Sequence, residues 1–277
     1  MKRGQTIVVN NARDDDFGAA GRHVKSAVID ETYQYRGHHL LWRIAADFLY
    51  YVLVPIVALV LIVIYGVRFT NRAAIRKLGG CYIYGNHTHW MDVFFPFMLS
   101  YPKRAYIVTG PTAVSIPVVK HLVAMLGGIP LNTTLAGKVA FREALNRVVA
   151  QGSPVAIFPE VHEWPYYNGI RDFSPASFTY PVRTSTPVVG YVVTYRRRWL
   201  KNRPPHLTVT VGSPVMPQVW EGAANPKQVV RDQVHQFMCD TVRALDSQAW
   251  VRYQIGGQPP TSEQPGSPGD SGDLPLD

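Results

Sequence analysis

The sequence CYIYGNHTHWMD, residues 81–92, joins a short apolar run to a cluster of polar side chains. The run at residues 81–84 predicts a buried strand. Ligands of α/β folds bind at the carboxyl ends of strands, so His87 and Asp92 are well placed to contact one. If a helix begins near Thr88, Asp92 returns beneath His87 and accepts a hydrogen bond from one ring nitrogen. The other nitrogen is then free to act as a general base.

The rest of the chain alternates between strand-like and helix-like patterns. Short apolar runs predict four more strands, at residues 105–108, 155–158, 188–193 and 207–211. Helices are predicted at residues 135–149 and after Asn225-Pro226. The apolar face of the first helix consists of Leu135, Val139, Leu145 and Val149. This alternation predicts an α/β sandwich with a largely parallel central sheet.

Residues 48–67 are twenty consecutive residues without a charged side chain. As a helix they reach about 30 Å, the thickness of a bilayer's hydrocarbon core. We therefore expect contact with a membrane rather than the buried core helix of a soluble domain. Pro55 leaves two forms open, a kinked span and a helical hairpin that dips into one leaflet.

These patterns divide the chain into four segments. Residues 1–43 are a polar leader, and residues 44–78 are a membrane-anchoring segment. Residues 79–250 contain the alternating strands and helices and form the main domain. Residues 251–277 are rich in Pro and Gly, which predicts a disordered tail.

Basic residues are denser after the apolar segment than before it. Arg68, Arg72, Arg76 and Lys77 follow it closely, while only Arg36 and Arg43 precede it at similar distances. The positive-inside rule then places the main domain on the cytoplasmic face of the cell membrane.

Composition narrows the class of protein. The chain has 28 Lys and Arg against 19 Asp and Glu, a net charge of +9, and only 17% charged residues. So few charges exclude wholesale disorder, and a basic body suits anionic lipids, phosphorylated ligands or nucleic acid. No helix-turn-helix or RNA-recognition pattern is present, so we expect no nucleic-acid partner.

Cys81 and Cys239 form no C-x-x-C pair, which excludes a disulfide framework.

The N-H-x4-D pattern from Asn86 to Asp92 resembles the first of four sequence blocks of the glycerolipid acyltransferases. The second, third and fourth blocks are similar to Gly127-Gly128-Ile129-Pro130-Leu131-Asn132, Phe158-Pro159-Glu160 and Thr186-Pro187-Val188-Val189. Four blocks in the family's order, over residues 79–195, are far more specific than one alone. The resemblance implies that family's α/β sandwich, preceded here by a membrane helix.

The resemblance also implies a reaction and roles for particular residues. His87 is the expected general base, Asp92 its partner, and Glu160 is expected to place the acceptor. The expected acyl donor is a thioester of coenzyme A or acyl carrier protein, and no metal or cofactor is expected. The expected acceptor is the hydroxyl of a lysophosphatidate or lysophospholipid held among membrane lipids.

The chain departs from the family in its second and third blocks. Asn132 and Thr133 occupy positions where the family usually has Asp-Arg, and with Asn86 they are further candidates for substrate contacts. The third block continues as Val-His-Glu-Trp-Pro-Tyr-Tyr, residues 161–167, which resembles a divergent bacterial branch of the family. The roles of the His and Glu in this run are left open. Arg171 is our candidate replacement for the missing cation, because a guanidinium suits bidentate phosphate contact.

Two other functions remain possible on sequence grounds. The missing basic residues keep open a catalytically silent lipid-binding protein of the same fold. His87, His89 and Asp92 could instead be ligands of a metal-dependent hydrolase, although their spacing differs from that of the metallo-β-lactamase pattern. We expect a membrane-bound O-acyltransferase.

Overall fold

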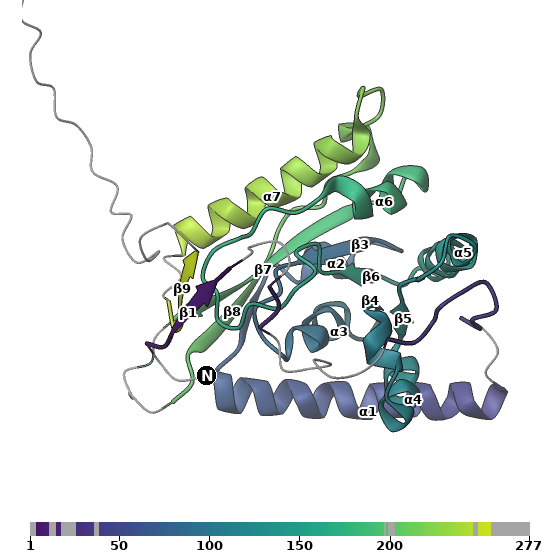
Figure 1. The fold of residues 1–277 in the computed structure, drawn as a ribbon, viewed down its shortest axis with the longest axis horizontal. Coiled ribbons are helices and arrows are strands. Elements are labelled where there is room, and N and C mark those ends of the chain that lie inside the picture. The colour runs from purple at the N-terminus through teal and green to yellow at the C-terminus, as the bar shows by residue number, and fades with distance from the viewer. Residues whose placement is uncertain are drawn as a thin grey trace, which may run out of the picture.

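The computed structural model describes residues 4–10, 15–17, 26–35, 39–196, 198, 203–245 and 249–255. Within these residues a seven-stranded sheet lies between two layers of helices (Figure 1). In spatial order its strands are β2 (Arg68–Thr70), β8 (His206–Val211), β7 (Val188–Arg196), β3 (Tyr82–Gly85), β6 (Val155–Ile157), β4 (Tyr106–Thr109) and β5 (Gly128–Pro130). Neighbouring strands are parallel except for the antiparallel pair β7 and β8. The predicted α/β fold with a mostly parallel sheet is therefore confirmed.

Helices cover both faces of the sheet because its strands bury side chains on both sides. One layer contains α1 (Leu40–Tyr65), α2 (Ala73–Arg76), α3 (Phe95–Ser100) and α4 (Pro117–Leu126). The other contains α5 (Gly137–Ala150), α6 (Thr179–Arg183) and α7 (Pro226–Ala244). Alternate residues of β3 divide between the two cores. Ile83 packs with the α1 layer, whereas Tyr82 and Tyr84 pack with the α5 and α7 layer.

All five strands predicted from apolar runs are present, and α7 begins after Asn225 as expected. The sequence patterns missed β2 and β5, which have three residues each. Such short strands are recognisable only from the neighbour they pair with, β8 for β2 and β4 for β5.

The apolar face predicted for α5 was half right, because Leu145 and Val149 pack on the core while Leu135 and Val139 do not. Val139 is 51% exposed, and Leu135 precedes the helix and is also exposed. The buried side chains are instead Phe141, Leu145 and Val148 with small residues between them. At about 100° per residue, Leu145 lies about 80° around the helix from position 135. The four predicted residues therefore do not share one narrow face of the helix.

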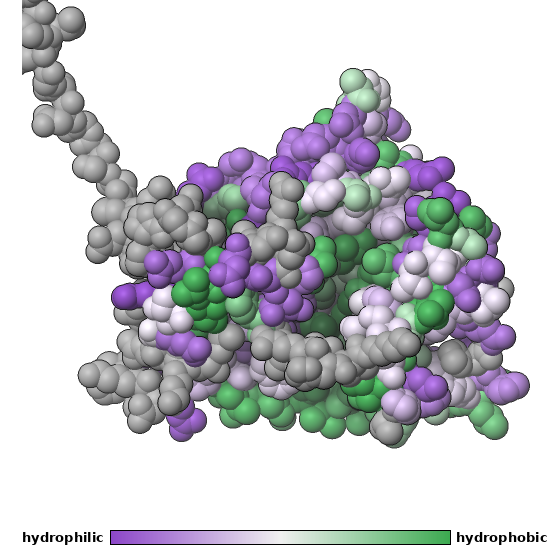
Figure 2. Space-filling model, in the orientation of Figure 1, coloured by the Kyte–Doolittle hydropathy of each residue, from purple (hydrophilic) through white to green (hydrophobic). Residues whose placement is uncertain are grey.

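Helix α1 begins at Leu40, earlier than its apolar segment indicated, and continues unbroken through Pro55. The hairpin alternative is therefore not found. The buried side chains of α1 form one stripe that packs against α3 and α4. They are Ala46, Tyr50, Val54 and Leu61. Leu49, Leu53 and Val57 are partly buried beside this stripe. The apolar side chains on the opposite side of the helix are exposed and form the hydrophobic lower edge in Figure 2. Among the described residues, α1 is the one helix that could cross a membrane by its length and composition.

Strands β1 (Thr6–Val9) and β9 (Arg252–Ile255) form a separate two-stranded parallel sheet. We predicted no strand in the leader and none in the tail, so this pairing corrects both predictions. It joins residues more than two hundred positions apart, which no local pattern can indicate. Residues 256–277 of the predicted tail lie outside the described residues. The four-segment division otherwise stays a prediction, although β2 lies inside the predicted anchor.

The face of α5 can be tested by paired substitutions. Leu145 is fully buried, so Leu145→Ala should lower the free energy of unfolding by about 2–5 kcal/mol through lost packing and a cavity. Val139→Ala on the same helix removes exposed methyl groups and should change it by less than about 0.5 kcal/mol. Denaturant unfolding of the purified protein measures both values, and equal losses would contradict this helix face.

Candidate active site

The loop after β3 is organised by the carboxylate of Asp92. Its Oδ2 accepts hydrogen bonds from the backbone N–H groups of Thr88 and His89, at 2.6 and 2.8 Å. The same oxygen lies 3.3 Å from His87 Nδ1. The predicted approach of Asp92 to His87 is confirmed. A 3₁₀ turn at Asp92–Phe94, rather than a helix from Thr88, brings it about.

Close packing fixes the end of β3. A Cβ added at Gly85 would lie 2.1 Å from Tyr191 Cζ, so a larger residue would displace the Tyr191 ring. Asn86 is buried, and its side chain pairs with the backbone of Val193 in β7, accepting at 2.8 Å and donating at 3.0 Å. Asn86 thus fastens the loop after β3 to the sheet, and its amide is not turned toward a substrate.

The side chain of His87 is 19% exposed and stacks on Phe158, with ring centroids 4.6 Å apart. Within the described residues, Nε2 has no hydrogen-bond partner. Burial alone would lower the pKa of His87, but the hydrogen bond and charge of Asp92 outweigh it. Glu163 and Glu160 act in the same direction, so the pKa of His87 is raised above its ordinary value.

The second histidine of the loop has a different environment. His89 is 1% exposed and packs edge-on against Tyr65 and Tyr166. Burial lowers the pKa of His89, and the nearby charge of Asp92 only partly opposes this. The ring is therefore neutral and enclosed, which suits packing rather than proton transfer.

Residues 158–167 form a second loop that holds the first. The N–H groups of Trp164 and Tyr166 donate to the carbonyl oxygens of His87 and Thr88, at 3.0 and 2.7 Å. Val161 and Tyr166 adopt left-handed backbone angles, with φ of 66° and 61°. Each such residue costs about 1–3 kcal/mol and persists where the surroundings impose it. The sequence did not indicate Phe158 as a wall of the site, nor Tyr195, whose hydroxyl donates to the Thr88 carbonyl at 2.9 Å.

Glu160 and Arg171 meet beneath His87 as a buried ion pair. Arg171 Nη2 lies 3.0 Å from Glu160 Oε2, and the Arg171 N–H donates to Oε1 at 3.1 Å. The backbone N–H of His87 approaches the same carboxylate at 3.4 Å. Arg171 also donates to the His162 carbonyl and lies over the Trp164 ring. Its guanidinium is thus engaged within the protein, which does not favour our assignment of Arg171 as a phosphate ligand.

Asn132 and Thr133 are not brought to this centre. They follow β5, which is separated from β3 by β6 and β4, so about 14 Å of sheet lies between them. The Asn132 amide donates to the Thr134 carbonyl at 2.8 Å. Thr133 Oγ1 accepts from the Ile29 N–H at 2.9 Å and so binds the leader.

Glu163, whose role the sequence left open, belongs to the centre. Burial raises its pKa to about 7, and the charge of His87 opposes this. Asp92 and Asp16 raise it further. A carboxyl that titrates near neutral pH beside a histidine is typical of catalytic sites. Its backbone is fixed by the leader, because Phe17 N–H donates to the Glu163 carbonyl at 3.1 Å.

Part of the chain is similar to known proteins. Residues 66–194 match the family model described as Acyltransferase, a range that includes His87, Asp92, Glu160 and Arg171. This segment is therefore similar to the acyltransferase domains that the model describes. The fold is similar to the crystal structure of the 1-acyl-sn-glycerophosphate acyltransferase PlsC from Thermotoga maritima, with a TM-score of 0.51 and 19% identity. That match covers 66% of this chain and 73% of the other. No curated protein matches the sequence.

The electrostatics of this site can be tested through the pKa of His87. In Asp92→Asn the burial of the ring remains while the carboxylate is lost. The pKa of His87 should therefore fall from above to below the ordinary histidine value of about 6.5. Titration of the imidazole NMR signals measures it, with His235 on α7 as an internal control. An unchanged His87 titration would contradict the pairing.

The ion pair beneath the site predicts non-additive effects on stability. Arg171→Gln leaves the Glu160 carboxylate buried without its partner and should lower the free energy of unfolding by about 3–5 kcal/mol. The double variant Glu160→Gln with Arg171→Gln should lose clearly less than the sum of the two single losses. Denaturant unfolding of all four proteins tests this, and additive losses would show that the two side chains are not coupled.

Proposed function

We propose that the protein transfers a fatty acyl group from an acyl thioester to the hydroxyl of a lysophosphatidate or lysophospholipid at a membrane surface. The observation that carries the proposal is the His87–Asp92 pair. One ring nitrogen of His87 is oriented by a buried carboxylate, and the ring remains partly open to solvent. This is the base and orienter of a catalytic triad without its nucleophile.

The protein's own candidate nucleophiles are poorly suited to attack a thioester. Thr88 Oγ1 is buried and 2.7 Å from the Tyr195 hydroxyl. Cys81 is buried in the core on the α1 side of the sheet, where burial raises its thiol pKa to about 12. Cys239 lies on α7, and burial raises its pKa as well. The substrate's hydroxyl is therefore the nucleophile, and no covalent acyl-enzyme is required.

The mechanism follows from the orientation of His87. Nε2 takes the proton of the acceptor hydroxyl as that oxygen attacks the thioester carbonyl carbon. The tetrahedral intermediate collapses, the C–S bond breaks, and the departing thiolate receives the proton from Nε2. A positioned base of this kind contributes about 10²- to 10⁴-fold in rate. Glu160, held by Arg171, supports the loop on which the acceptor would be placed.

The exposed face of α1 supports a membrane location. The buried stripe of α1 packs along α3 and α4, so a helix crossing the bilayer would draw these helices in with it. Lying in the interface instead, α1 covers its apolar face with lipid and leaves the domain in water. We place the domain on the cytoplasmic face of the cell membrane, where acyl-coenzyme A and acyl carrier protein are present.

The alternatives make different predictions. A silent lipid-binding protein would bind the acceptor without turnover, and the positions of Asn132 and Thr133 keep this possibility open. For a metal-dependent hydrolase, no cluster of three or more potential ligands occurs among the described residues. Asp92 Oδ2 already accepts two backbone N–H groups, which also disfavours metal coordination.

Acyl transfer can be measured with purified full-length protein in neutral detergent, using labelled acyl-coenzyme A or acyl carrier protein and a panel of lysophospholipids. His87→Ala should lower kcat/KM by about 10²- to 10⁴-fold. His121→Ala, an exposed histidine of α4, should leave it unchanged. Because protonated His87 cannot accept a proton, kcat/KM should fall as pH drops through the raised pKa of His87.

The outcomes separate the candidate functions. Equal activity of wild type and His87→Ala would exclude the proposed base. Binding of a lysophospholipid without turnover, with either donor, would assign the protein to the silent class. Turnover abolished by chelator and restored by a metal ion would favour the hydrolase.

A further inference from the structure

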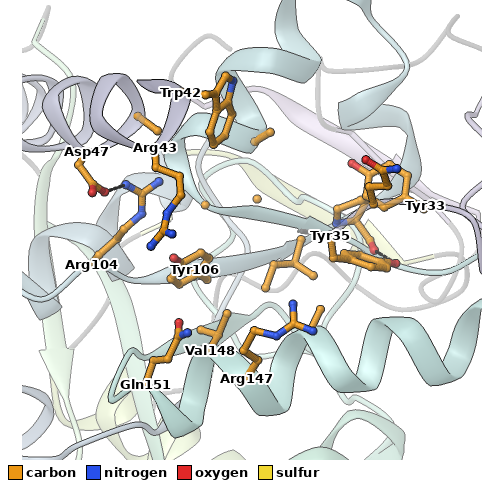
Figure 3. Close-up of a pocket in the computed structure, with 18 residues that line it drawn as sticks. Tyr33, Tyr35, Trp42, Arg43, Asp47, Arg104, Tyr106, Arg147, Val148 and Gln151 are labelled. Carbon is orange, nitrogen blue, oxygen red and sulfur yellow. Dashed lines mark hydrogen bonds and ion pairs between the residues drawn. The ribbon is translucent and has the colours of Figure 1, made fainter. Parts of the chain in front are cut away.

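A cavity of about 520 Å³ lies away from the acyltransferase site. Its walls come from the first turns of α1, the ends of α4 and α5, the start of β4, all of β5, and residues 33–35 of the leader (Figure 3). This volume lies within the range of small-ligand sites, about 300–1,000 Å³.

The cavity opens at the opposite edge of the sheet from His87. Of β4 only its first residue, Tyr106, lines the cavity, whereas β5 lines it over its whole length, from Gly128 to Pro130. His87 and Glu160 instead follow the last residues of β3 and β6. Because β4 is parallel to β6, and β6 to β3, Tyr106 lies at the opposite end of the sheet from His87 and Glu160. Two strands, β6 and β4, separate β5 from β3. The cavity is therefore separate from the centre that carries the proposed reaction.

Three arginines and one carboxylate face this cavity. Arg104 forms an ion pair with Asp47, donates to the Met125 carbonyl and lies over the Tyr106 ring. Its charge is thus compensated and its position fixed. Arg43 and Arg147 remain, and within the described part of the chain neither guanidinium has an ion-pair or hydrogen-bond partner. They reach toward the cavity from opposite walls, Arg43 from α1 and Arg147 from α5 (Figure 3).

The remaining lining favours a ligand that is more than a bare ion. Tyr33, Tyr35, Trp42 and Tyr106 supply aromatic walls, and Tyr33 and Tyr35 pack edge to face at 4.8 Å. Two uncompensated guanidinium groups suit the oxygens of a phosphate, which they can bind in bidentate fashion. Aromatic side chains beside them suit the carbon skeleton attached to that phosphate.

The cavity also adjoins the apolar face of α1. Trp42, Arg43 and Asp47 line it from the same turns that expose Leu41 and Ile44. A phosphate in the cavity would thus lie beside side chains suited to lipid. We propose that this cavity is a second, non-catalytic site for a phosphate-bearing ligand such as an anionic lipid headgroup, with Arg43 and Arg147 as its phosphate ligands. The proposal does not depend on the acyl-transfer activity.

Isothermal titration calorimetry of the full chain in neutral detergent at low salt tests the site. The probes are inorganic phosphate, glycerol 3-phosphate and short-chain phosphatidylglycerol. Arg43→Gln and Arg147→Gln should each weaken binding by about tenfold or more, as expected for a lost charge-assisted hydrogen bond. Lys138→Gln, the same charge change on an exposed position of α5 outside the cavity, should leave binding unchanged.

A variant that keeps every charge complements these substitutions. Ala124 lines the cavity from α4, so Ala124→Leu should fill part of it and weaken binding by a similar factor. Thermal unfolding without ligand shows whether each variant is folded. Tighter binding of phosphatidylglycerol than of both water-soluble phosphates identifies a lipid headgroup site, whereas equal affinities identify a site for soluble phosphate compounds. The proposal is overturned if no probe binds folded wild type, or if Lys138→Gln weakens binding as much as Arg147→Gln.

Discussion

The buried carboxylate of Asp92 is the interaction on which the site depends. One oxygen accepts from two consecutive backbone N–H groups and approaches the His87 ring. The turn, the orientation of His87 and the charge beside it therefore have a single origin. The loop at residues 158–167 can then bond the carbonyls of His87 and Thr88 because the turn presents them outward. Removing Asp92 alters geometry and electrostatics together, so its effects on the pKa of His87 and on activity should be measured side by side.

The two histidines of this loop show how burial and charge compete. Both rings lose water, which lowers the pKa of each. Only His87 gains a direct hydrogen bond to Asp92 and the added influence of Glu163 and Glu160. Asp92 raises the pKa of both rings, but only at His87 does this effect exceed that of burial. One histidine becomes a stronger base at a partly open position, and the other stays neutral within a cluster of aromatic rings.

Sequence reasoning succeeded where local pattern and structure share a cause. Apolar runs indicated the central strands, and the spacing from His87 to Asp92 indicated their contact. It failed where the partner is distant, as in the pairing of β1 with β9 and the binding of Thr133 to Ile29. Arg171 shows the same limit, because its basic character suggested a phosphate ligand. Only the fold shows that the Arg171 guanidinium forms an ion pair with Glu160. The catalytic roles themselves stay predictions.

Helix α1 shows why composition alone could not separate a membrane span from a surface helix. It is apolar on nearly every side, the usual sign of a span. Yet one stripe, including Tyr50 and Leu61, closes the core of the domain. The opposite side exposes side chains such as Phe48 and Leu59. Leaving their apolar surface in water costs about 25 cal/mol per Å² of free energy relative to burying it. A helix with both properties suits a position between a folded domain and an apolar phase. In the proposed arrangement the bilayer is that phase, and the cationic cavity beside the first turns of α1 then lies at headgroup depth.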